Sequence, residues 1–234
     1  LVDVVSNPEF LREGEAIRDF IFPDRVIIGT DSKKANNKLK SLYLPIIKKT
    51  SRYFSTSRRS AELIKYASNA FLATKITFIN ELANLTEKTG VDIKDISQGI
   101  GSDQRIGDRF LRAGPAYGGS CFPKDTRALI DTANQFKTNL TIVKSVIFSN
   151  NKRKLLLTKR LEKILLKLKN KNLVDIVSNP EFLREGEAIR DFIYPDRVII
   201  GTDSKKANDI LKSLYLPIIK KKRRNFKKSR RGAE

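Results

Sequence analysis

The sequence predicts an α/β chain in which short apolar strands precede a set of long helices. Three observations favour this class. Two short apolar runs adjoin the turn pairs Asn7-Pro8 and Pro23-Asp24, where a proline stops or starts a strand. The segment Ser60–Thr89 keeps apolar residues at helical spacing. Leu1–Lys49 recurs near the C-terminus, so the predicted strands should occur twice.

The first quarter of the chain predicts two strands, a helix and a loop. Leu1–Val5 and Arg25–Gly29 are apolar and of strand length. Ser32 can cap a helix that runs to about Leu44, because a proline follows and favours a stop. Thr50–Ser57 is polar and is predicted to be a loop.

The central helix, Ser60–Thr89, is the strongest helical prediction. Ser60 is a candidate N-cap, and Gly90 can end the helix in the left-handed conformation. Its apolar positions are Leu63, Ile64, Ala67, Ala70, Phe71, Ile76, Ile79, Leu82, Ala83 and Leu85. A helix of this length can cross a small domain.

Three further helices are predicted downstream. Asp92–Ile100 and Pro123–Gln135 flank the glycine-rich, irregular segment Gly101–Gly119. Leu140–Leu168 is largely helical. It carries an apolar stripe of Leu157, Leu161, Ile164, Leu165 and Leu168.

The chain of 234 residues has a formal net charge of +21, from 47 Lys and Arg against 26 Asp and Glu. Most of the excess lies in two stretches: 151–172 has nine basic residues and one acid, and 220–231 has nine basic residues and no acid. The first stretch is interpreted as a solvated helix face and the second as the end of the repeat. Because aromatic interleaving and reader motifs are lacking, no specific nucleic-acid partner is expected.

The residue counts exclude several kinds of site. There is no His, which excludes a Ser-His-Asp triad, a Cys-His pair and His metal ligands. A single Cys excludes an internal disulfide and a Cys-based zinc site, so no metal is expected. No run of 18 apolar residues occurs, so no membrane association and a cytoplasmic location are expected. The absence of Met indicates a chain that starts inside a longer reading frame.

The repeat is long and nearly exact. Leu1–Lys49 recurs as Leu173–Lys221 at an offset of 172, with four differences, and weaker matches continue to Glu234. Solenoid repeats are shorter, more numerous and more divergent. The pattern favours a recent duplication or a rearranged reading frame over a designed tandem domain.

The lone cysteine lies in the sequence YGGSCFPKD. Glycines before Cys121 let a backbone approach closely, and a predicted helix start and Lys124 follow it, which favours the thiolate form. A lone Cys is often a small buried hydrophobe instead. The surroundings favour a nucleophile.

Polar candidates for proton transfer lie elsewhere. Glu9 and Glu13 follow the first predicted strand, where α/β sheets place ligand contacts, although they are equally well explained as helix N-terminal acids. Lys65 and Asn69 are four residues apart and so share one helix face. The Lys either extends along the apolar surface towards water or points into a polar site.

Four segments together, NPEFLREG, ELIKYASNAFLATK, GSDQRIG and YGGSCFPKD, resemble the signatures of the UDP-glucose 6-dehydrogenases within the UDP-glucose/GDP-mannose dehydrogenase superfamily. The likeness is nearly continuous over 1–170 and returns over 173–234. It implies a remnant of a Rossmann-like NAD domain (1–55), a central all-helical dimerisation domain with the cysteine (56–150), a basic amphipathic helix (151–172) and a duplicate of residues 1–62 (173–234).

The resemblance implies an NAD-dependent, two-step oxidation of UDP-glucose through a Cys-linked thioester. It assigns Cys121 as the nucleophile, Asp125 to activate the hydrolytic water, Lys65 to stabilise the oxyanion, Asn69 to position the water or that oxygen, and Glu9 to acid/base work. These roles need no His.

The resemblance also implies binding roles. The substrate-binding residues would be Phe10, Leu11, Glu13, Phe110, Leu111, Tyr117 and Gly118, with Arg105 reaching across a homodimer formed through the 60–89 helix. Glu13 would also lie near the nicotinamide of NAD, with Lys124 on the cofactor side.

Departures from the family pattern lead to an expectation of low or no activity for this chain alone. The Gly-x-Gly-x-x-Gly turn for NAD does not occur, and the repeat stands where the C-terminal domain for the nucleotide sugar is expected. Ala116 occupies a position that is usually Gly. The repeat retains Glu181 and Glu185 without a counterpart of Lys65, so it should not form a second site. The alternative is a non-catalytic, dimerising fragment of the family.

Overall fold

The computed structural model describes residues 2–12, 14–47, 52–167, 175, 177–183, 187–219 and 225–228. These residues form two compact units. The first contains 1–9, 26–44 and 49–164, and the second contains 10–25, 45–48 and 165–234. Each unit is treated by itself. None of the helices in the described residues has the length and apolar character needed to cross a membrane.

The first unit contains a two-stranded parallel sheet. Strand β1 (Val26–Gly29), predicted from the sequence, is fully buried and pairs with β2 (Tyr53–Thr56), with Val26 opposite Tyr53 and Gly29 opposite Thr56. The prediction of a loop over Thr50–Ser57 is therefore wrong for the strand residues. Parallel pairing is non-local, and β1 supplies the partner that the polar local sequence does not indicate.

The predicted strand Leu1–Val5 is also wrong. Residues 2–5 have no regular structure, and Leu1 lies outside the described residues. The next residue, Ser6, forms a single antiparallel bridge with Gly29, through two N–H···O bonds of 2.8 Å. The apolar run is largely exposed, so it does not gain the burial that would support a strand.

Helix α2 (Lys33–Ile47) starts as predicted, because Ser32 Oγ accepts a hydrogen bond from the Ala35 N–H at 3.1 Å. Its predicted end before Pro45 is wrong, since Pro45 lies inside the helix. Proline has a helical φ and loses a single hydrogen bond here, in the last turn. The extra residues carry Ile47 into a buried position.

The long helix α3 (Arg58–Thr89) is confirmed, with Gly90 at its C-cap in the left-handed region (φ 74°). The N-cap is Ser57, whose side chain accepts from the Ser60 N–H, so the prediction of Ser60 as cap is wrong. The two serines both have capping chemistry, and the end of β2 places the helix start at the earlier one.

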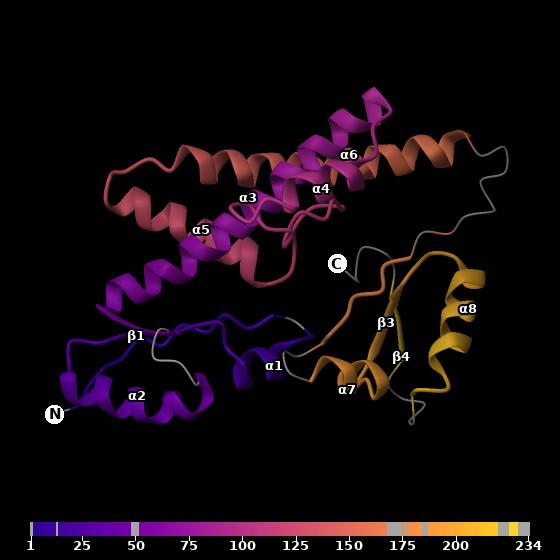
Figure 1. The fold of residues 1–234 in the computed structure, drawn as a ribbon. Coiled ribbons are helices and arrows are strands. Elements are labelled where there is room, and N and C mark those ends of the chain that lie inside the picture. The colour runs from indigo at the N-terminus through magenta and orange to yellow at the C-terminus, as the bar shows by residue number, and fades with distance from the viewer. Residues whose placement is uncertain are drawn as a thin grey trace. The chain divides into compact units, whose positions relative to one another are not determined.

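Three helices complete the first unit (Figure 1): α4 (Ile93–Gly101), capped by Asp92, α5 (Cys121–Gln135) and α6 (Thr141–Lys167). α3 packs against α5, α4 and β1. A buried cluster of Ala73, Tyr117 and Val146, flanked by Ile76 and Phe122, joins α3, α5, α6 and the loop before α5.

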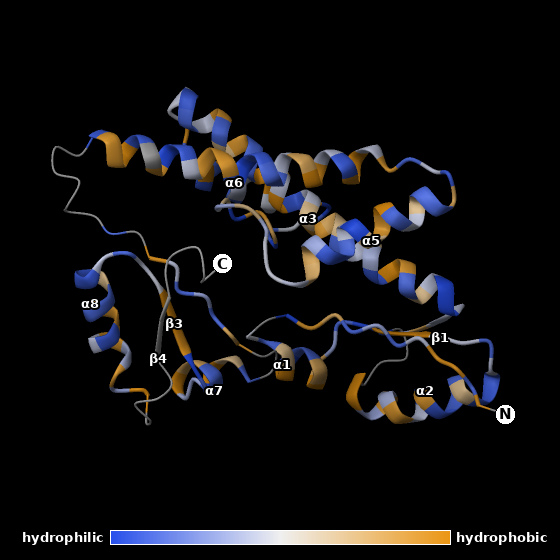
Figure 2. Cartoon of the chain, turned by 180° about the vertical axis from the view of Figure 1, so that it is seen from behind, coloured by the Kyte–Doolittle hydropathy of each residue, from blue (hydrophilic) through white to orange (hydrophobic). Residues whose placement is uncertain are grey.

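Helix α6 carries the predicted apolar stripe, but Leu161 and Ile164 are 61% and 58% exposed, and Leu168 lies outside the described residues. Among the described basic residues of α6, Arg153 is buried and Arg160 is half-buried, whereas the others are exposed as predicted. In Figure 2 the strands β1 and β3 are hydrophobic, whereas α3, α5 and α6 alternate hydrophobic and hydrophilic residues.

The repeated sequence takes up the same local structure in the second unit. β3 (Val198–Gly201) pairs in parallel with β4 (Asn225–Lys228), and Ser178 bridges to Gly201. Helices α7 (Ala188–Ile193) and α8 (Lys205–Tyr215) correspond to α1 (Ala16–Ile21) and α2. Val198, Ile200 and Ile219 form a buried hydrophobic cluster in this part of the chain.

Candidate active site

The site is built where the first residue of α5 meets α3. The sequence placed Cys121 before a helix, but α5 begins at Cys121 itself. Asp125 therefore lies one turn further on the same face. Its carboxylate is 2% exposed and accepts a hydrogen bond of 2.5 Å from Asn69 Nδ2 of α3. The buried acid is thus satisfied by an amide from the neighbouring helix.

A second polar pair lies one turn earlier on α3. Lys65 Nζ donates to the Glu9 backbone oxygen at 2.5 Å and to Glu9 Oε1 at 2.6 Å. The Lys65 side chain is 15% exposed, whereas that of Glu9 is 50% exposed. The alternative of a lysine that only extends along the surface is thus ruled out, since Lys65 forms a specific pair with the segment before α1.

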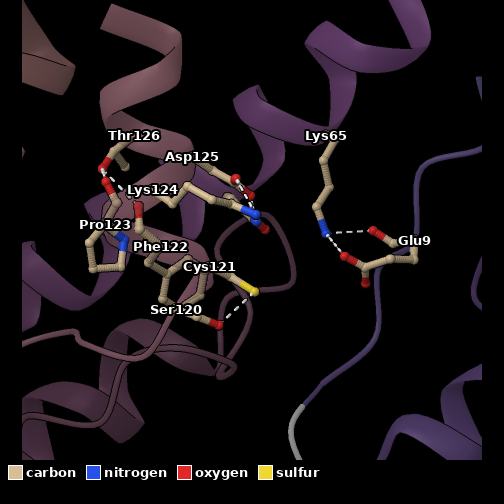
Figure 3. A network of polar contacts seen from close by, with 10 residues as sticks. Glu9, Lys65, Ser120, Cys121, Phe122, Pro123, Lys124, Asp125 and Thr126 are labelled. Carbon is tan, nitrogen blue, oxygen red and sulfur yellow. Dashed lines mark hydrogen bonds and ion pairs between the residues drawn. The ribbon is translucent and has the colours of Figure 1, made fainter. Parts of the chain in front are cut away.

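Figure 3 shows how these groups lie: the sulfur of Cys121 points away from α5 to the side on which Lys65 and Glu9 are drawn. The Cys121 side chain is half-buried, and its Sγ contacts the Ser120 hydroxyl at 3.7 Å. Because Lys65 and Asn69 share one face of α3, a single rigid helix positions both polar pairs. The arrangement brings together a thiol, an ammonium group and two carboxylates, of which that of Glu9 is half-exposed and that of Asp125 is buried.

The loop before α5 holds several of the predicted substrate-binding residues. Tyr117 is buried, and its ring lies edge-on to Phe122 with centroids 6.1 Å apart. Burial raises the pKa of Tyr117 above the ordinary value of a tyrosine. Phe110 has a positive φ of 66° and also meets Phe122 edge-on, at 6.2 Å. Gly118 is exposed, with open space where a side chain would be.

Leu111 and Lys124 differ in exposure. The Leu111 side chain is 2% exposed and its carbonyl oxygen accepts from Ser97 Oγ at 2.6 Å. Lys124 is an exposed side chain that lies 3.8 Å from Asp125 Oδ1.

Two other predicted residues, Arg105 and Phe10, form local contacts. Arg105 folds back on Asp103, with its guanidinium 2.6 Å from that carboxylate, and this bond lowers the pKa of Asp103. Phe10 and Leu11 belong to the second unit, where the Arg25 guanidinium lies 4.1 Å from the centre of the Phe10 ring. Glu13 lies outside the described residues.

Three buried polar residues that the sequence analysis did not single out hold the loop before the cysteine: Asn80 on α3, and Asn150 and Arg153 on α6. Arg153 was counted there among the solvated charges. A signal was present, since Asn150 and Arg153 lie three apart and so on one helix face. These residues also line a cavity of about 300 Å³ between α3 and α6.

Comparisons with known proteins identify the family of the chain. Residues 59–152 match the central domain of the UDP-glucose/GDP-mannose dehydrogenase family, and residues 1–47 and 124–219 match its NAD binding domain. The chain belongs to this family. The UDP-glucose 6-dehydrogenase of Rickettsia typhi is 54% identical over 151 residues, which are 64% of this chain and 35% of the relative.

Two more relatives of this dehydrogenase family support the match. The UDP-glucose 6-dehydrogenase YwqF of Bacillus subtilis is 51% identical over 164 residues, which are 70% of this chain and 37% of the relative. The solved structure of a UDP-glucose dehydrogenase from Pyrobaculum islandicum has a TM-score of 0.66 and 41% identity over 70% of this chain and 37% of that one. The chain thus spans little more than a third of the length of these dehydrogenases.

The family's NAD cofactor can be tested against the residues of this chain. A pyrophosphate group needs a glycine-rich turn and free backbone N–H groups at a helix N-terminus. At the end of β1, a Cβ on Gly29 would lie 2.6 Å from Ala61 Cβ and 2.8 Å from Arg58 Cα, so the first turn of α3 fills this space. Strand β1 lies within the residues matched by the NAD binding domain model, but the crowded turn at Gly29 leaves no room for a pyrophosphate there.

Proposed function

We propose that residues 9, 65, 69, 121 and 125 form the nucleophile side of a UDP-glucose 6-dehydrogenase active site. The observation that carries the proposal is the buried Asn69–Asp125 pair, set one helical turn beyond Cys121. A buried carboxylate beside a cysteine at a helix start suits hydrolysis of an acyl-enzyme. The names of the relatives supply the substrate, UDP-glucose.

The roles follow from the chemistry of each group. A first oxidation of the C6 alcohol of UDP-glucose would give the C6 aldehyde. Cys121 then adds to this aldehyde, and the S–C bond forms as the carbonyl π pair moves to oxygen. Lys65 stabilises this developing oxyanion. The thiohemiacetal would then lose a hydride from C6 to bound NAD and a proton from its oxygen, which gives the thioester. Water then attacks the thioester, and Asp125, which Asn69 holds in place, takes the proton of the water. The C–S bond breaks, and Cys121 leaves as the thiolate.

Glu9 is proposed for acid/base work, because its half-exposed carboxylate already meets Lys65 Nζ. NAD, when bound, accepts one hydride in each oxidation. Glu13 and Lys124 are proposed for the cofactor side. The remaining substrate contacts are proposed as Phe10, Leu11, Phe110, Leu111, Tyr117 and Gly118, with Arg105 from a second copy. We place this chemistry in the cytoplasm.

We propose that α3 also forms a homodimer interface. Phe71 and Phe78 on this helix are 67% and 51% exposed, which is costly for large aromatic side chains in water. The same observation favours the alternative function, a dimerising fragment that does not turn over substrate. Elution as a monomer in size-exclusion chromatography would contradict both the dimer and this alternative.

The domain organisation is likewise a proposal: 1–55 as part of the NAD binding domain, 56–150 as the central domain, 151–172 as a basic helix and 173–234 as a duplicate of 1–62. The match of the NAD binding domain model to both ends of the chain supports the duplication. So does the equal register of β1–β2 and β3–β4, in which the partner residues differ by the same offset.

The catalytic proposal is tested without NAD by using the 6-aldehyde of UDP-glucose as probe. The aldehyde should protect Cys121 from alkylation by iodoacetamide, as followed by mass spectrometry of the intact chain. The 6-aldehyde of GDP-mannose serves as the control and should protect less. Equal alkylation with and without the UDP sugar aldehyde would contradict the proposed role of Cys121.

A further inference from the structure

The loop before Cys121 contains a residue in an uncommon conformation. Ala116 has φ 145°, a positive value that residues with a Cβ rarely adopt. Ala116 lies four residues before the end of the turn that leads into α5. Such backbone persists where the surrounding structure over-determines it.

The two backbone polar groups of Tyr117, the residue after Ala116, are both held by one side chain. The Tyr117 N–H donates to Asn150 Oδ1 at 2.8 Å, and the Tyr117 carbonyl oxygen accepts from Asn150 Nδ2 at 3.0 Å. Asn150 is 3% exposed, and both bonds lie in the interior. One side-chain amide therefore satisfies the complete backbone of Tyr117.

The backbone two residues before Ala116 is held in the same way. The Gly114 N–H donates to Asn80 Oδ1 at 2.7 Å, and the Gly114 carbonyl oxygen accepts from Arg153 Nε at 3.2 Å. Arg153 also donates to the Asn80 carbonyl oxygen at 3.2 Å and to the Asn84 side-chain oxygen. Burial lowers the pKa of Arg153, and these acceptors offset the cost of the buried cation.

We propose that Asn80, Asn150 and Arg153 act as a loop clamp that enforces the conformation of Ala116 and thereby positions Cys121. Four hydrogen bonds from two helices fix the backbone on either side of Ala116. The clamp is linked to Cys121 by one contact, because the Tyr117 ring packs against Phe122, the residue that follows the cysteine. These are positioning residues, and their consequence for turnover rests on the function proposed for Cys121.

The first experiment removes the clamp at one point in the full chain. Asn150→Ala deletes both bonds to Tyr117, so backbone amides of residues 115–121 should exchange with deuterium roughly tenfold faster or more, since each lost buried bond shifts the local opening equilibrium. Alkylation of Cys121 by iodoacetamide should rise in parallel. Asn150→Asp keeps the acceptor for the Tyr117 N–H and should give a smaller rise, which preserves the test if the alanine variant does not fold.

The second experiment separates positioning from general stability. In the double variant Asn150→Ala with Ala116→Gly, glycine adopts the positive φ without a Cβ, so exchange of residues 115–121 and Cys121 alkylation should return towards wild type. If Asn150 only stabilised the fold in general, Ala116→Gly would not restore the amide exchange of residues 115–121 or the alkylation of Cys121.

The matched control is Arg160→Ala, because Arg160 also joins α6 to α3, through Glu87 at 2.6 Å, without contacting the loop. It should leave exchange of 115–121 unchanged. A uniform rise of exchange across α3, α5 and α6, or no recovery with Ala116→Gly, would overturn the clamp. None of these measurements uses substrate, so a failure of the catalytic proposal would show in the aldehyde experiment instead.

Discussion

The two copies of the repeated sequence differ in what surrounds them, although their local structure is the same. In the N-terminal segment, Tyr43 donates to Asn7 Oδ1 at 2.5 Å, and in the C-terminal segment, Tyr215 donates to Asn179 Oδ1 at the same distance. Both segments also form a parallel strand pair in the same register. The repeated sequence therefore forms the same strand pair and the same Tyr–Asn hydrogen bond in both places.

The corresponding glutamates show the difference. Glu9 receives the Lys65 ammonium from α3, whereas the Glu181 carboxylate accepts from the Leu183 backbone N–H at 2.6 Å. Within the described part of the chain, no lysine or arginine forms an ion pair with Glu181. An identical residue in an identical sequence is thus proposed to join an active site in one place only, because helix α3 supplies the rest.

The largest expected effect comes from removing the lysine that distinguishes the two copies. Lys65→Ala should slow the reaction of Cys121 with the 6-aldehyde of UDP-glucose by about 10²–10³-fold, the usual loss when one oxyanion donor is deleted. Mass spectrometry of the adduct measures the rate. Unfolding should change little, because the Glu9 side chain is half exposed and such pairs contribute at most about 1 kcal/mol.

The second prediction breaks the packing between α3 and the N-terminal segment. Gly29→Ala puts a Cβ 2.6 Å from Ala61 Cβ and 2.7 Å from the Ser57 carbonyl oxygen. Such overpacking should lower the free energy of unfolding by about 1–3 kcal/mol, measured by chemical denaturation. Gly99→Ala is the control, since it has open space on helix α4 and should be neutral or stabilise by up to about 1 kcal/mol.

The third prediction asks whether the two segments are equally well formed. Tyr43→Phe and Tyr215→Phe each remove one hydrogen bond to an asparagine, so each should destabilise its own strand by about 1 kcal/mol. Amide exchange in Val26–Gly29 and Val198–Gly201 reports the two effects separately. A response in only one strand would show that the copies fold differently.

The smallest expected effect concerns pH. The hydrogen bond from Arg12 lowers the pKa of Asp19, so the ionised pair stabilises the fold above the ordinary aspartate range and is lost as pH falls through the lowered pKa. NMR titration of Asp19 should show this shift, and Arg12→Ala should raise its pKa towards the ordinary value. An unshifted Asp19 in the wild-type chain would contradict the pairing.

The helices were largely predictable because their signals are local. Ser32, Asp92 and Gly90 mark helix ends by capping chemistry that depends on neighbours in sequence. Strand β2 was not predictable in this way, because Tyr53–Thr56 is polar and becomes a strand through its partner β1.

The sequence predicted which residues form the candidate site, but it did not predict which of their side chains contact each other. The spacing of Lys65 and Asn69 indicated one helix face, and the motifs indicated Cys121 and Asp125. Only the fold shows that Asn69 meets Asp125 and that Lys65 meets Glu9. The clamp residues were missed because their partners are backbone groups of a distant loop. The spacing of Asn150 and Arg153 indicates a shared helix face and does not indicate these partners.

The most direct test of the proposed site compares Glu9 with Glu181, its counterpart in the repeat. Glu9→Gln and Glu181→Gln are made in the full chain, and the rate at which the 6-aldehyde of UDP-glucose forms its adduct with Cys121 is followed for each. The account predicts a slower reaction for Glu9→Gln, which weakens the hold on Lys65, and an unchanged rate for Glu181→Gln. Equal rates in the two variants would contradict the assignment of the N-terminal copy, joined to α3, as the active one.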